Sequence, residues 1–408
     1  MVMVLFTACS NDSIGPEKTG PRITTFERSF GGAGEDLGND VLSTADGSCI
    51  LVGWTDTEGT NGDILVMKID GKGNQIWKRV LEGEEFEVAE AIIETADGGY
   101  LVTGWSHSIE SLVSKVIVVK LDAKGRVVWQ SNIAELGHAI AFDVVSAPDG
   151  GFVIAGLCDT NNSGQVDVLL LKISSDGEEQ WRRIYGGASY DAAVSIAKSP
   201  MGGYILAGST DSFGAGKLDA YLLAVDDSGL FKWQKTFGGI GNDNIRSVAV
   251  DHDGSILLTG GIESSQAGIL DIYLLKTDMN GNLLWETTIG GKGSERGEAI
   301  EILSDGGLAV AGYSSSFASG IWDVFLVRTD DSGKILWQRN YGGSSSELGW
   351  AMDKTYDGGF VITGWTKSFG AILHDVYLVK TDSNGEVFDG LGDSASSTFN
   401  MEQIHLTD

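Results

Sequence analysis

The sequence is poor in the residues that several classes of protein depend on. Its 408 residues include three cysteines, four prolines and five histidines, too few for a disulfide framework. It has no clustered metal-ligand spacing, phosphate-binding loop, dinucleotide fingerprint or G-x-S-x-G nucleophile motif. It also has no apolar stripe of helical period and no run near the roughly 20 apolar residues that span a bilayer. We therefore expect no metal, no cofactor and no membrane-spanning helix.

Positive charge is also scarce. Lysine and arginine number 28 against 57 aspartates and glutamates, which gives a formal net charge of −29. Such a charge repels phosphate backbones and anionic lipid headgroups. We expect no nucleic-acid partner and no membrane binding through charge.

Glycine is abundant, with 58 residues, and it recurs in phase with tryptophan. Six tryptophans repeat at a spacing of 52 residues: Trp77, Trp129, Trp181, Trp233, Trp285 and Trp337. The glycine of a D-x-x-G turn repeats seven times at the same spacing: Gly73, Gly125, Gly177, Gly229, Gly281, Gly333 and Gly385. A fixed period of this kind indicates one structural unit stacked on copies of itself, and the glycines count seven units.

Each unit reads as four short antiparallel strands. Its apolar runs, such as Tyr204-Ile-Leu-Ala-Gly and Asp375-Val-Tyr-Leu-Val-Lys, are short, rich in β-branched residues and bounded by Asp-Gly turns. One unit cannot bury both of its faces, so neighbours must stack face to face and close a ring. We predict an all-β, seven-bladed propeller in which the tryptophan of the fourth strand packs between adjacent blades.

The two ends of the chain predict how the ring closes. After the last D-x-x-G turn the tryptophan is missing, and Glu386-Val387-Phe388-Asp389-Gly390 replaces a strand. At the other end, residues 23–30 read like a fourth strand with no first three before it. We expect this segment to supply the outer strand of the seventh blade and to remove an open edge. The single propeller domain then spans residues 23–390.

The repeats also carry a family resemblance. The string Phe237-Gly-Gly-Ile-Gly-Asn-Asp, followed by Ser247-Val-Ala-Val-Asp-His-Asp-Gly and Leu258-Thr-Gly, resembles the bacterial seven-bladed repeat often labelled SBBP. The resemblance covers residues 23 to about 390 and implies a fold but no single activity. The D-x-x-G-x-x-x-W string, as in Asp278 to Trp285, is similar to the tryptophan-docking motif of quinoprotein and outer-membrane assembly propellers. Those propellers usually have eight blades and one more residue between Asp and Trp.

The N-terminus resembles a bacterial lipoprotein signal. An apolar stretch, residues 1–8, precedes Cys9, and residues 9–22 form a polar tether. The resemblance implies an acyl anchor at Cys9 as the only membrane attachment, on an outer-membrane or surface lipoprotein of the cell envelope. The alternative is a frayed N-terminus with a chance cysteine. Residues 391–408 read as a polar tail.

Two sets of residues are candidates for a site on the face that carries the loops between blades. One is a ring of carboxylates at the channel mouth, which could attract a cation: Asp36, Glu87, Asp191, Asp243, Glu295 and Glu347. The alternative is that each carboxylate caps its own loop by accepting backbone N–H bonds. The other set is an arc of aromatic residues at the ends of second strands, in one nearby loop and at the start of one first strand: Trp54, Trp105, Tyr313, Trp322, Trp350 and Trp365. Flat aromatic faces stack on sugar rings and apolar ligands, although packing between blades is the alternative.

A third, irregular patch overlaps one end of the arc. In the second and third blades Lys115 replaces a recurring Asp, and His107 and His138 should approach each other. These groups could orient a polar part of a ligand. The alternative is that the sequence of these loops has changed without any role in binding.

We therefore expect a non-catalytic, monomeric binding module that recognises a glycan or an envelope protein with its loop face. One competing class is a carbohydrate-active hydrolase or lyase that uses channel carboxylates, because 57 acidic residues cannot exclude a catalytic pair. The other is a structural scaffold for envelope assembly, related to quinoprotein-like propellers.

Overall fold

The computed structural model describes residues 24–56, 62–108, 110–133, 137–159, 165–263, 269–370 and 373–389. Within these ranges every regular element is a β-strand, and no helix long and apolar enough to cross a membrane occurs there. The strands form seven four-stranded antiparallel sheets, which we number as blades 1 to 7. The predicted fold class is confirmed.

The strands follow one another along the chain, four to a blade. Blades 1 to 3 comprise β2 (Asp36–Ser43), β3 (Cys49–Thr55), β4 (Asp63–Ile69), β5 (Gln75–Leu81), β6 (Phe86–Glu94), β7 (Tyr100–His107), β8 (Ser114–Leu121), β9 (Val127–Ile133), β10 (His138–Ser146), β11 (Phe152–Asp159), β12 (Asp167–Ile173) and β13 (Glu179–Tyr185). Blades 4 to 6 comprise β14 (Asp191–Lys198), β15 (Tyr204–Thr210), β16 (Asp219–Val225), β17 (Phe231–Phe237), β18 (Asn244–Val250), β19 (Ile256–Glu263), β20 (Leu270–Thr277), β21 (Leu283–Ile289), β22 (Glu295–Ile302), β23 (Leu308–Ser314), β24 (Asp323–Thr329) and β25 (Ile335–Tyr341). Blade 7 comprises β26 (Glu347–Lys354), β27 (Phe360–Thr366), β28 (Asp375–Lys380) and β1 (Phe26–Phe30).

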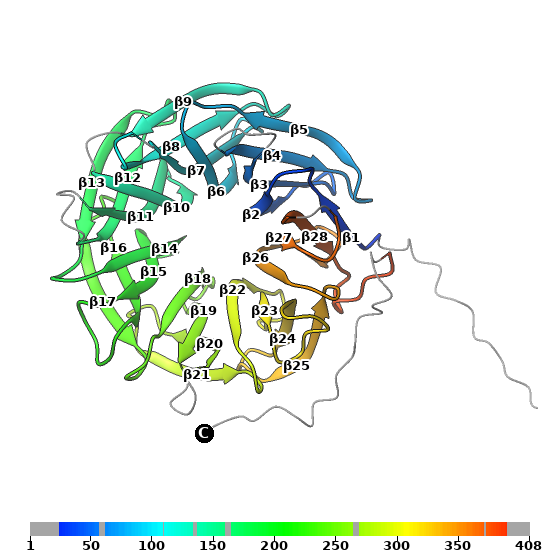
Figure 1. The fold of residues 1–408 in the computed structure, drawn as a ribbon. Helices are drawn as coiled ribbons and strands as arrows, with labels where there is room; N and C mark the ends of the chain where they lie inside the picture. Colours follow the sequence, from blue (N-terminus) through cyan, green and yellow to red (C-terminus); the bar gives the residue numbers. More distant parts are fainter. Residues whose placement is uncertain are drawn as a thin grey trace, which may run out of the picture.

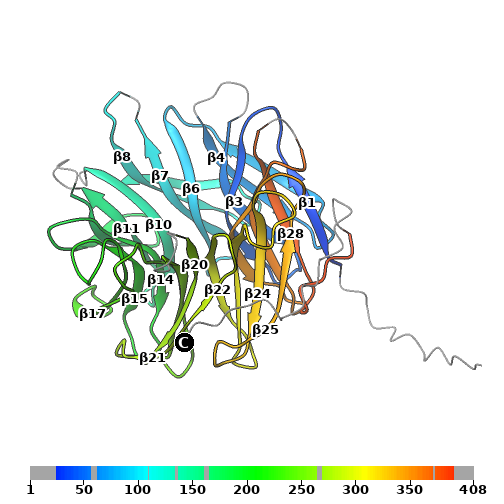
Figure 2. The ribbon, with the colours of Figure 1, turned by 60° about the horizontal axis from the view of Figure 1, so that its bottom comes forward.

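The blades are arranged as a ring around a central channel (Figure 1). The first strand of each blade lies innermost, and neighbouring sheets lie side by side around the ring (Figures 1 and 2). These inner strands are β2, β6, β10, β14, β18, β22 and β26. Loops that join one blade to the next meet the loops between second and third strands at one end of the channel, for example where the Asp56 N–H donates to the Glu35 carbonyl over 2.7 Å. We call this end the loop face.

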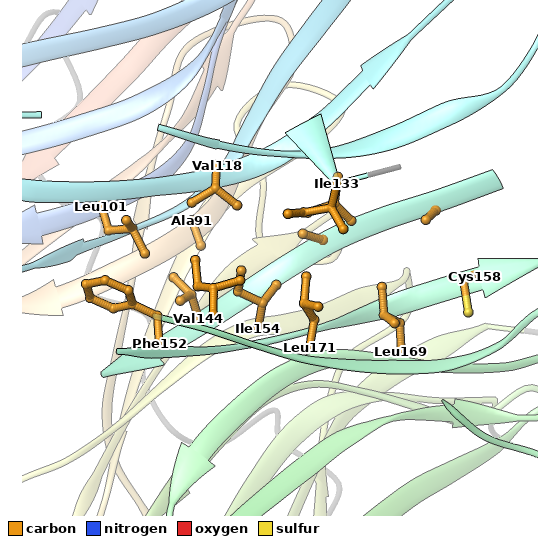
Figure 3. Packing of buried hydrophobic residues seen from close by; sticks show 14 residues of the cluster. Ala91, Leu101, Val118, Ile133, Val144, Phe152, Ile154, Cys158, Leu169 and Leu171 are labelled. Carbon is orange, nitrogen blue, oxygen red and sulfur yellow. The ribbon is translucent and has the colours of Figure 1, made fainter. Parts of the chain in front are cut away.

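The core lies between the blades. Side chains of blade 2, such as Leu101 and Val118, pack against Val144, Ile154 and Leu171 of blade 3 (Figure 3). The other clusters of buried residues also span neighbouring sheets. Each sheet therefore buries both faces, as the continuous apolar runs predicted.

The recurring tryptophans pack at the outer edge of these interfaces. A Cβ built on Gly125, in the D-x-x-G turn of blade 2, would lie 2.6 Å from the Trp77 ring of blade 1. The same contact joins Trp129 to Gly177 and Trp337 to Gly385. Glycine is needed here because its φ is positive, +70° at Gly125, and because the indole leaves no room for a side chain. The predicted packing of tryptophan between adjacent blades is confirmed.

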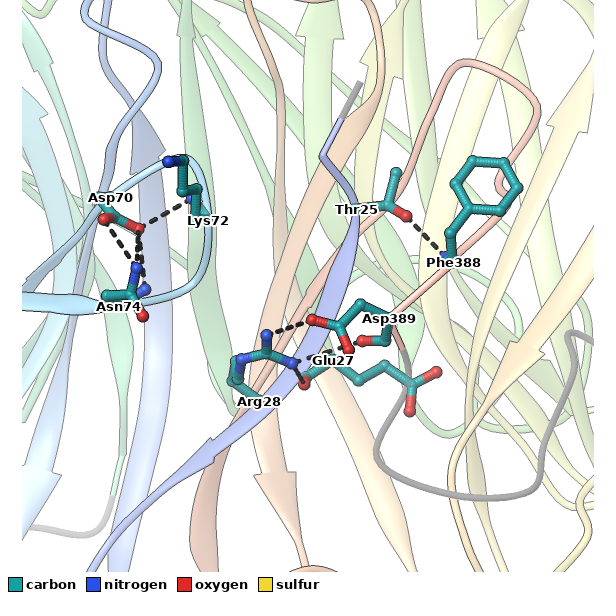
Figure 4. Close-up of polar contacts among 8 residues, drawn as sticks. All are labelled: Thr25, Glu27, Arg28, Asp70, Lys72, Asn74, Phe388 and Asp389. Atoms are coloured by element: carbon teal, nitrogen blue, oxygen red, sulfur yellow. Dashed lines mark hydrogen bonds and ion pairs between the residues drawn. The ribbon is translucent and has the colours of Figure 1, made fainter. Parts of the chain in front are cut away.

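The N-terminal strand closes the ring, as predicted. β1 pairs with β28 in antiparallel register, Phe26 opposite Lys380, and forms the outer strand of blade 7. The two chain ends are also tied to each other (Figure 4): the Glu27 N–H donates to the Asp389 carbonyl over 3.0 Å, and the Thr25 hydroxyl accepts a bond from the Phe388 N–H over 2.7 Å. An ion pair of 2.5 Å joins Arg28 to Asp389.

The D-x-x-G turns are built as the sequence indicates. Asp70 accepts bonds from the backbone N–H groups of Lys72 and Asn74, each over 2.8 Å (Figure 4). Cys49 and Cys158 are buried free thiols on β3 and β11. Cys9, the proposed signal and tether, and the tail of residues 391–408 lie outside the described residues.

Candidate functional site

The inner strand of every blade carries a β-bulge at the same position. Its register with the second strand shifts once, for example between Gly38 and Asp40 in blade 1 and between Gly349 and Ala351 in blade 7. A bulge leaves one extra residue out of the ladder and turns its side chain. We call these seven residues the bulge ring: Asn39, Glu90, Phe142, Val194, Arg246, Glu298 and Trp350.

All seven residues of the bulge ring line one cavity of about 680 Å³ in the channel. They include an amide, two carboxylates, a guanidinium and three apolar side chains, whereas the turns around them repeat almost without change. A column that varies from blade to blade, with only glutamate occurring twice, on the strand that faces the channel, has the property expected of a recognition surface. Trp54, Phe86 and Trp105 lie against the same cavity.

These three rings form a continuous group, the aromatic cluster. The Trp54 and Phe86 ring centroids are 5.2 Å apart, and those of Phe86 and Trp105 are 5.5 Å apart. All three side chains are half-buried. They join β3, β6 and β7 at the loop face, so they combine packing between blades with a surface open to the cavity.

Glu90 connects the aromatic cluster to the bulge ring. Its Oε1 accepts a bond from the Trp105 indole N–H over 2.7 Å, and its Oε2 lies 3.4 Å from the Asn39 amide nitrogen. Burial raises the pKa of Glu90 to about 7, although the Trp105 bond and the charge of Arg246 act in the opposite direction. The carboxyl group is therefore partly protonated at neutral pH.

Glu298 lies in a different electrostatic environment. Its Oε2 is 2.8 Å from the Arg246 Nε, and its Oε1 accepts a bond from the Arg296 Nε. Arg296 also stacks on Tyr313, with its guanidinium carbon 5.5 Å from the ring centroid. Two guanidinium groups therefore share one carboxylate on blades 5 and 6, on the opposite side of the channel from β6 (Figure 1).

Two further carboxylates in the cavity tie blades together. Asp40 accepts the Ile92 N–H of blade 2 over 2.8 Å, and Asp143 accepts the Ile196 N–H of blade 4 over 2.8 Å. Inner strands are edge strands with unpaired N–H groups, so these bonds satisfy donors that would otherwise lack a partner. Burial raises the pKa of Asp40 to about 8 and that of Asp143 to about 6.

The predicted carboxylates lie at the start of the inner strands, where the loops between blades end, and none of them lines the cavity. Each of five carboxylates accepts a bond from the second glycine of its own loop: Asp36 from Gly32, Asp191 from Gly187, Asp243 from Gly239, Glu295 from Gly291 and Glu347 from Gly343. The capping alternative accounts for these contacts. Glu87 is also buried, and burial, together with the charge of Asp63, raises its pKa to about 7.

The predicted aromatic arc is divided into smaller groups. Trp54, Trp105 and Trp350 line the cavity. Trp365 lies behind Trp350, with ring centroids 6.4 Å apart, and contacts His374 at 4.3 Å. Tyr313 and Trp322 contact each other edge to face at 5.2 Å, away from the cavity lining.

In the irregular patch of blades 2 and 3, both histidines contact Ser114. His107 Nδ1 lies 3.1 Å from the Ser114 hydroxyl, and the Ser114 N–H donates to His138 Nδ1 over 3.3 Å. Lys115 is paired with Glu85 at 3.4 Å. Among the described residues no group of three or more His, Cys, Asp or Glu side chains could hold a metal ion.

Sequence reasoning found one of the seven bulge-ring residues, Trp350, and missed the other six. The column is visible in the repeats as a position that varies between blades, with only glutamate occurring twice. A bulge, however, is a backbone feature, and no residue type marks it in these repeats. Strand alternation without the bulge does not place this column on the channel.

Comparisons with known proteins agree with the fold. No family model matches the chain. A regulatory protein, FlaEY, from Caulobacter vibrioides is 23% identical over 230 residues, which cover 48% of this chain and 24% of that protein. The matched segment thus spans about a quarter of that relative's length.

Solved structures of similar fold have unrelated functions. The WD40 domain of Neurospora crassa Pan2 aligns with TM-score 0.52 and 11% identity over 85% of this chain and 89% of that chain. A puromycin hydrolase mutant aligns with TM-score 0.54 and 15% identity over 92% of this chain and 54% of that chain. An α-L-arabinofuranosidase from Fusarium graminearum aligns with TM-score 0.51 and 12% identity over 89% of this chain and 98% of that chain. At these identities the likeness shows the fold alone: the chain is a seven-bladed β-propeller.

Proposed function

We propose that the protein is a non-catalytic binding module that takes a short glycan segment into the channel cavity from the loop face. The observation that carries the proposal is the bulge ring, in which seven side chains of six residue types converge on one cavity beside the aromatic cluster. A volume of about 680 Å³ lies within the usual range of ligand pockets. It would hold a short oligosaccharide.

The chemistry of the lining suits a sugar. Half-buried rings such as Trp54 and Trp105 offer flat apolar faces for the C–H face of a pyranose. The planar groups of Asn39, Glu90 and Arg246 offer paired donors and acceptors for hydroxyl groups. A protein partner that inserts a loop into the cavity is the competing ligand.

A glycan array followed by calorimetry tests the proposal. We expect Trp54→Ala and Trp105→Ala each to weaken binding of an array hit by about tenfold or more, because each removes a stacking face. Trp365→Ala should weaken it less, since Trp365 does not line the cavity. Tyr356→Ala is the matched control, because Tyr356 is 84% exposed and lies outside the cavity lining. Absence of any hit, or unchanged binding in both cavity variants, would overturn the proposal.

A carbohydrate-active enzyme is the second candidate, since Glu90 and Glu298 are two carboxyl groups with different partners in one cavity. Burial leaves Glu90 partly protonated at neutral pH, whereas Glu298 is paired with Arg246 at 2.8 Å. Both Glu298 oxygens are engaged by guanidinium groups, which opposes its use as a base or nucleophile. We therefore favour binding, and release of reducing ends from a bound oligosaccharide would instead favour hydrolysis.

We also retain the cell envelope as the proposed location, with an acyl anchor at Cys9. The proposal rests on the apolar stretch and small residue before Cys9. Incorporation of labelled fatty acid into the wild-type protein, and its loss in Cys9→Ser, is the expected result. Equal labelling of both proteins, or none of either, would contradict it.

A further inference from the structure

The charges that line the channel cavity are unbalanced. Five carboxyl groups face it, and the single cationic side chain among its lining residues is Arg246. Arg246 is already paired with Glu298, and Glu301 is paired with Lys354 at 2.9 Å. Three carboxyl groups of the lining then have no cationic partner among the described residues: Asp40, Glu90 and Asp143.

Two of these three are engaged in holding the blades together. Asp40 and Asp143 each accept backbone N–H bonds from the next blade and from their own following residue. Glu90 differs, because its donors are the side chains of Trp105 and Asn39. These donors fix the position of the Glu90 carboxyl group within the cavity but are neutral, so Glu90 has no direct ion pair among the described residues.

Glu90 also lies beside the aromatic cluster. Its Oε1 is 2.7 Å from the Trp105 indole nitrogen, and Trp105 packs on Phe86, which packs on Trp54. A carboxylate next to several aromatic faces is the environment that binds ammonium groups, by charge and by cation–π attraction. The opposite wall, where Arg246 and Arg296 share Glu298, would repel such a group. The cavity is therefore polarised across its width.

We propose that Glu90 and the aromatic cluster form a subsite for a cationic ammonium group, so that the bound glycan contains an amino sugar with a free amine. The inference rests on the proposed glycan-binding function and names its ligand class. The raised pKa of Glu90, about 7, agrees with a carboxyl group whose cationic partner arrives with the ligand.

A matched pair of ligands tests the subsite. The trimer of β-1,4-linked glucosamine and the trimer of N-acetylglucosamine differ only in acetylation, so calorimetry near pH 7, where Glu90 is partly ionised, isolates the contribution of the amine. We expect the wild-type protein to bind the amino trimer about tenfold or more tightly, which is the typical strength of a charge-assisted contact. Glu90→Gln should bind the two trimers equally.

Glu94→Gln is the matched control, because Glu94 lies on the same strand as Glu90 and is exposed. It should keep the preference for the amino trimer. Unchanged thermal melting of Glu90→Gln would show that the loss of preference is not a loss of fold. A trimethylated amino trimer, whose charge does not titrate, should bind more tightly as the pH rises from about 5.5 to about 7.5, since Glu90 ionises in this range.

A third ligand tests whether the amine must belong to a sugar. This ligand is a lysine peptide that is acetylated at its N-terminus and keeps the free side-chain amine. Binding of this peptide alone, with dependence on Glu90, would keep the ammonium subsite and overturn the glycan proposal. Equal binding of the two trimers by the wild-type protein would overturn the subsite and keep the glycan proposal. Absence of Glu90-dependent binding by all three ligands would also overturn the subsite.

Discussion

Phe26 occupies the position that the six recurring tryptophans occupy in the other blades. It lies opposite Lys380, as Trp77 lies opposite Lys68. A Cβ built on Gly73 would be 3.0 Å from its ring, and Arg28 stacks on it as Arg79 stacks on Trp77. The seventh aromatic residue of the repeat is thus present at the other end of the chain.

This equivalence predicts the effect of a single substitution. Phe26→Ala should lower the free energy of unfolding by about 3–5 kcal/mol, the usual range for a buried phenylalanine, because the ring is 1% exposed. Phe388→Ala is the control, since Phe388 is 74% exposed and should change stability by about 0.5 kcal/mol or less. Urea denaturation measures both, and a small effect of Phe26→Ala would show that this aromatic position does not hold the ring closed.

At the scale of the elements, β1 is the strand whose pairing joins the two ends of the chain. Its ladder with β28, and the bonds that Thr25 and Arg28 make with Phe388 and Asp389, tie residues 346 to 363 positions apart. Without β1, the outer edge of β28 is exposed and blade 7 has three strands.

Removal of residues 1–30 therefore tests the closure. We expect a lower melting temperature and concentration-dependent association, because the exposed edge of β28 is a template for pairing with another chain. Removal of residues 1–22, which leaves β1 intact, is the control and should melt like the full chain. If both truncated proteins melt like the full chain, β1 does not hold the ring closed.

The elements also differ in how far the sequence predicts them. Glycines of the D-x-x-G turns, such as Gly125 with a φ of +70°, mark their turns directly, since few other residues adopt that conformation. The bulges of the inner strands carry no such mark. Glu90 and Arg246 lie in them between ordinary strand residues, so their place on the channel was not predicted.

At the scale of the whole molecule, buried carboxyl groups make stability depend on pH. Raised pKa values occur in the channel, about 8 for Asp40 and about 7 for Glu90, and at the junctions between blades, about 6 for Asp271 and Asp323. Burial is the largest cause in each case, and neighbouring carboxylates add to it at Asp271 and Asp323. The native state binds protons at these groups that the unfolded state, with carboxyl pKa values near 4, has released.

The sign of the effect follows from this difference. The stabilising contribution of these groups is fully present below about pH 4 and is lost as the pH rises through their raised values. We therefore expect the melting temperature to fall between about pH 5 and pH 8. Asp271→Asn, which mimics the protonated group, should flatten this slope. A melting temperature that rises over the same interval in the wild-type protein would contradict the prediction.

The sequence by itself determined the number of blades, their strand order and the closure by the N-terminal strand. These features depend on local turn chemistry and on a period of 52 residues, both of which are readable along the chain. Only the tertiary structure decided which residues form the candidate site. The seven bulge-ring residues are each about 52 positions from the next, and they meet because the bulges turn them inward and the ring brings the inner strands around one channel.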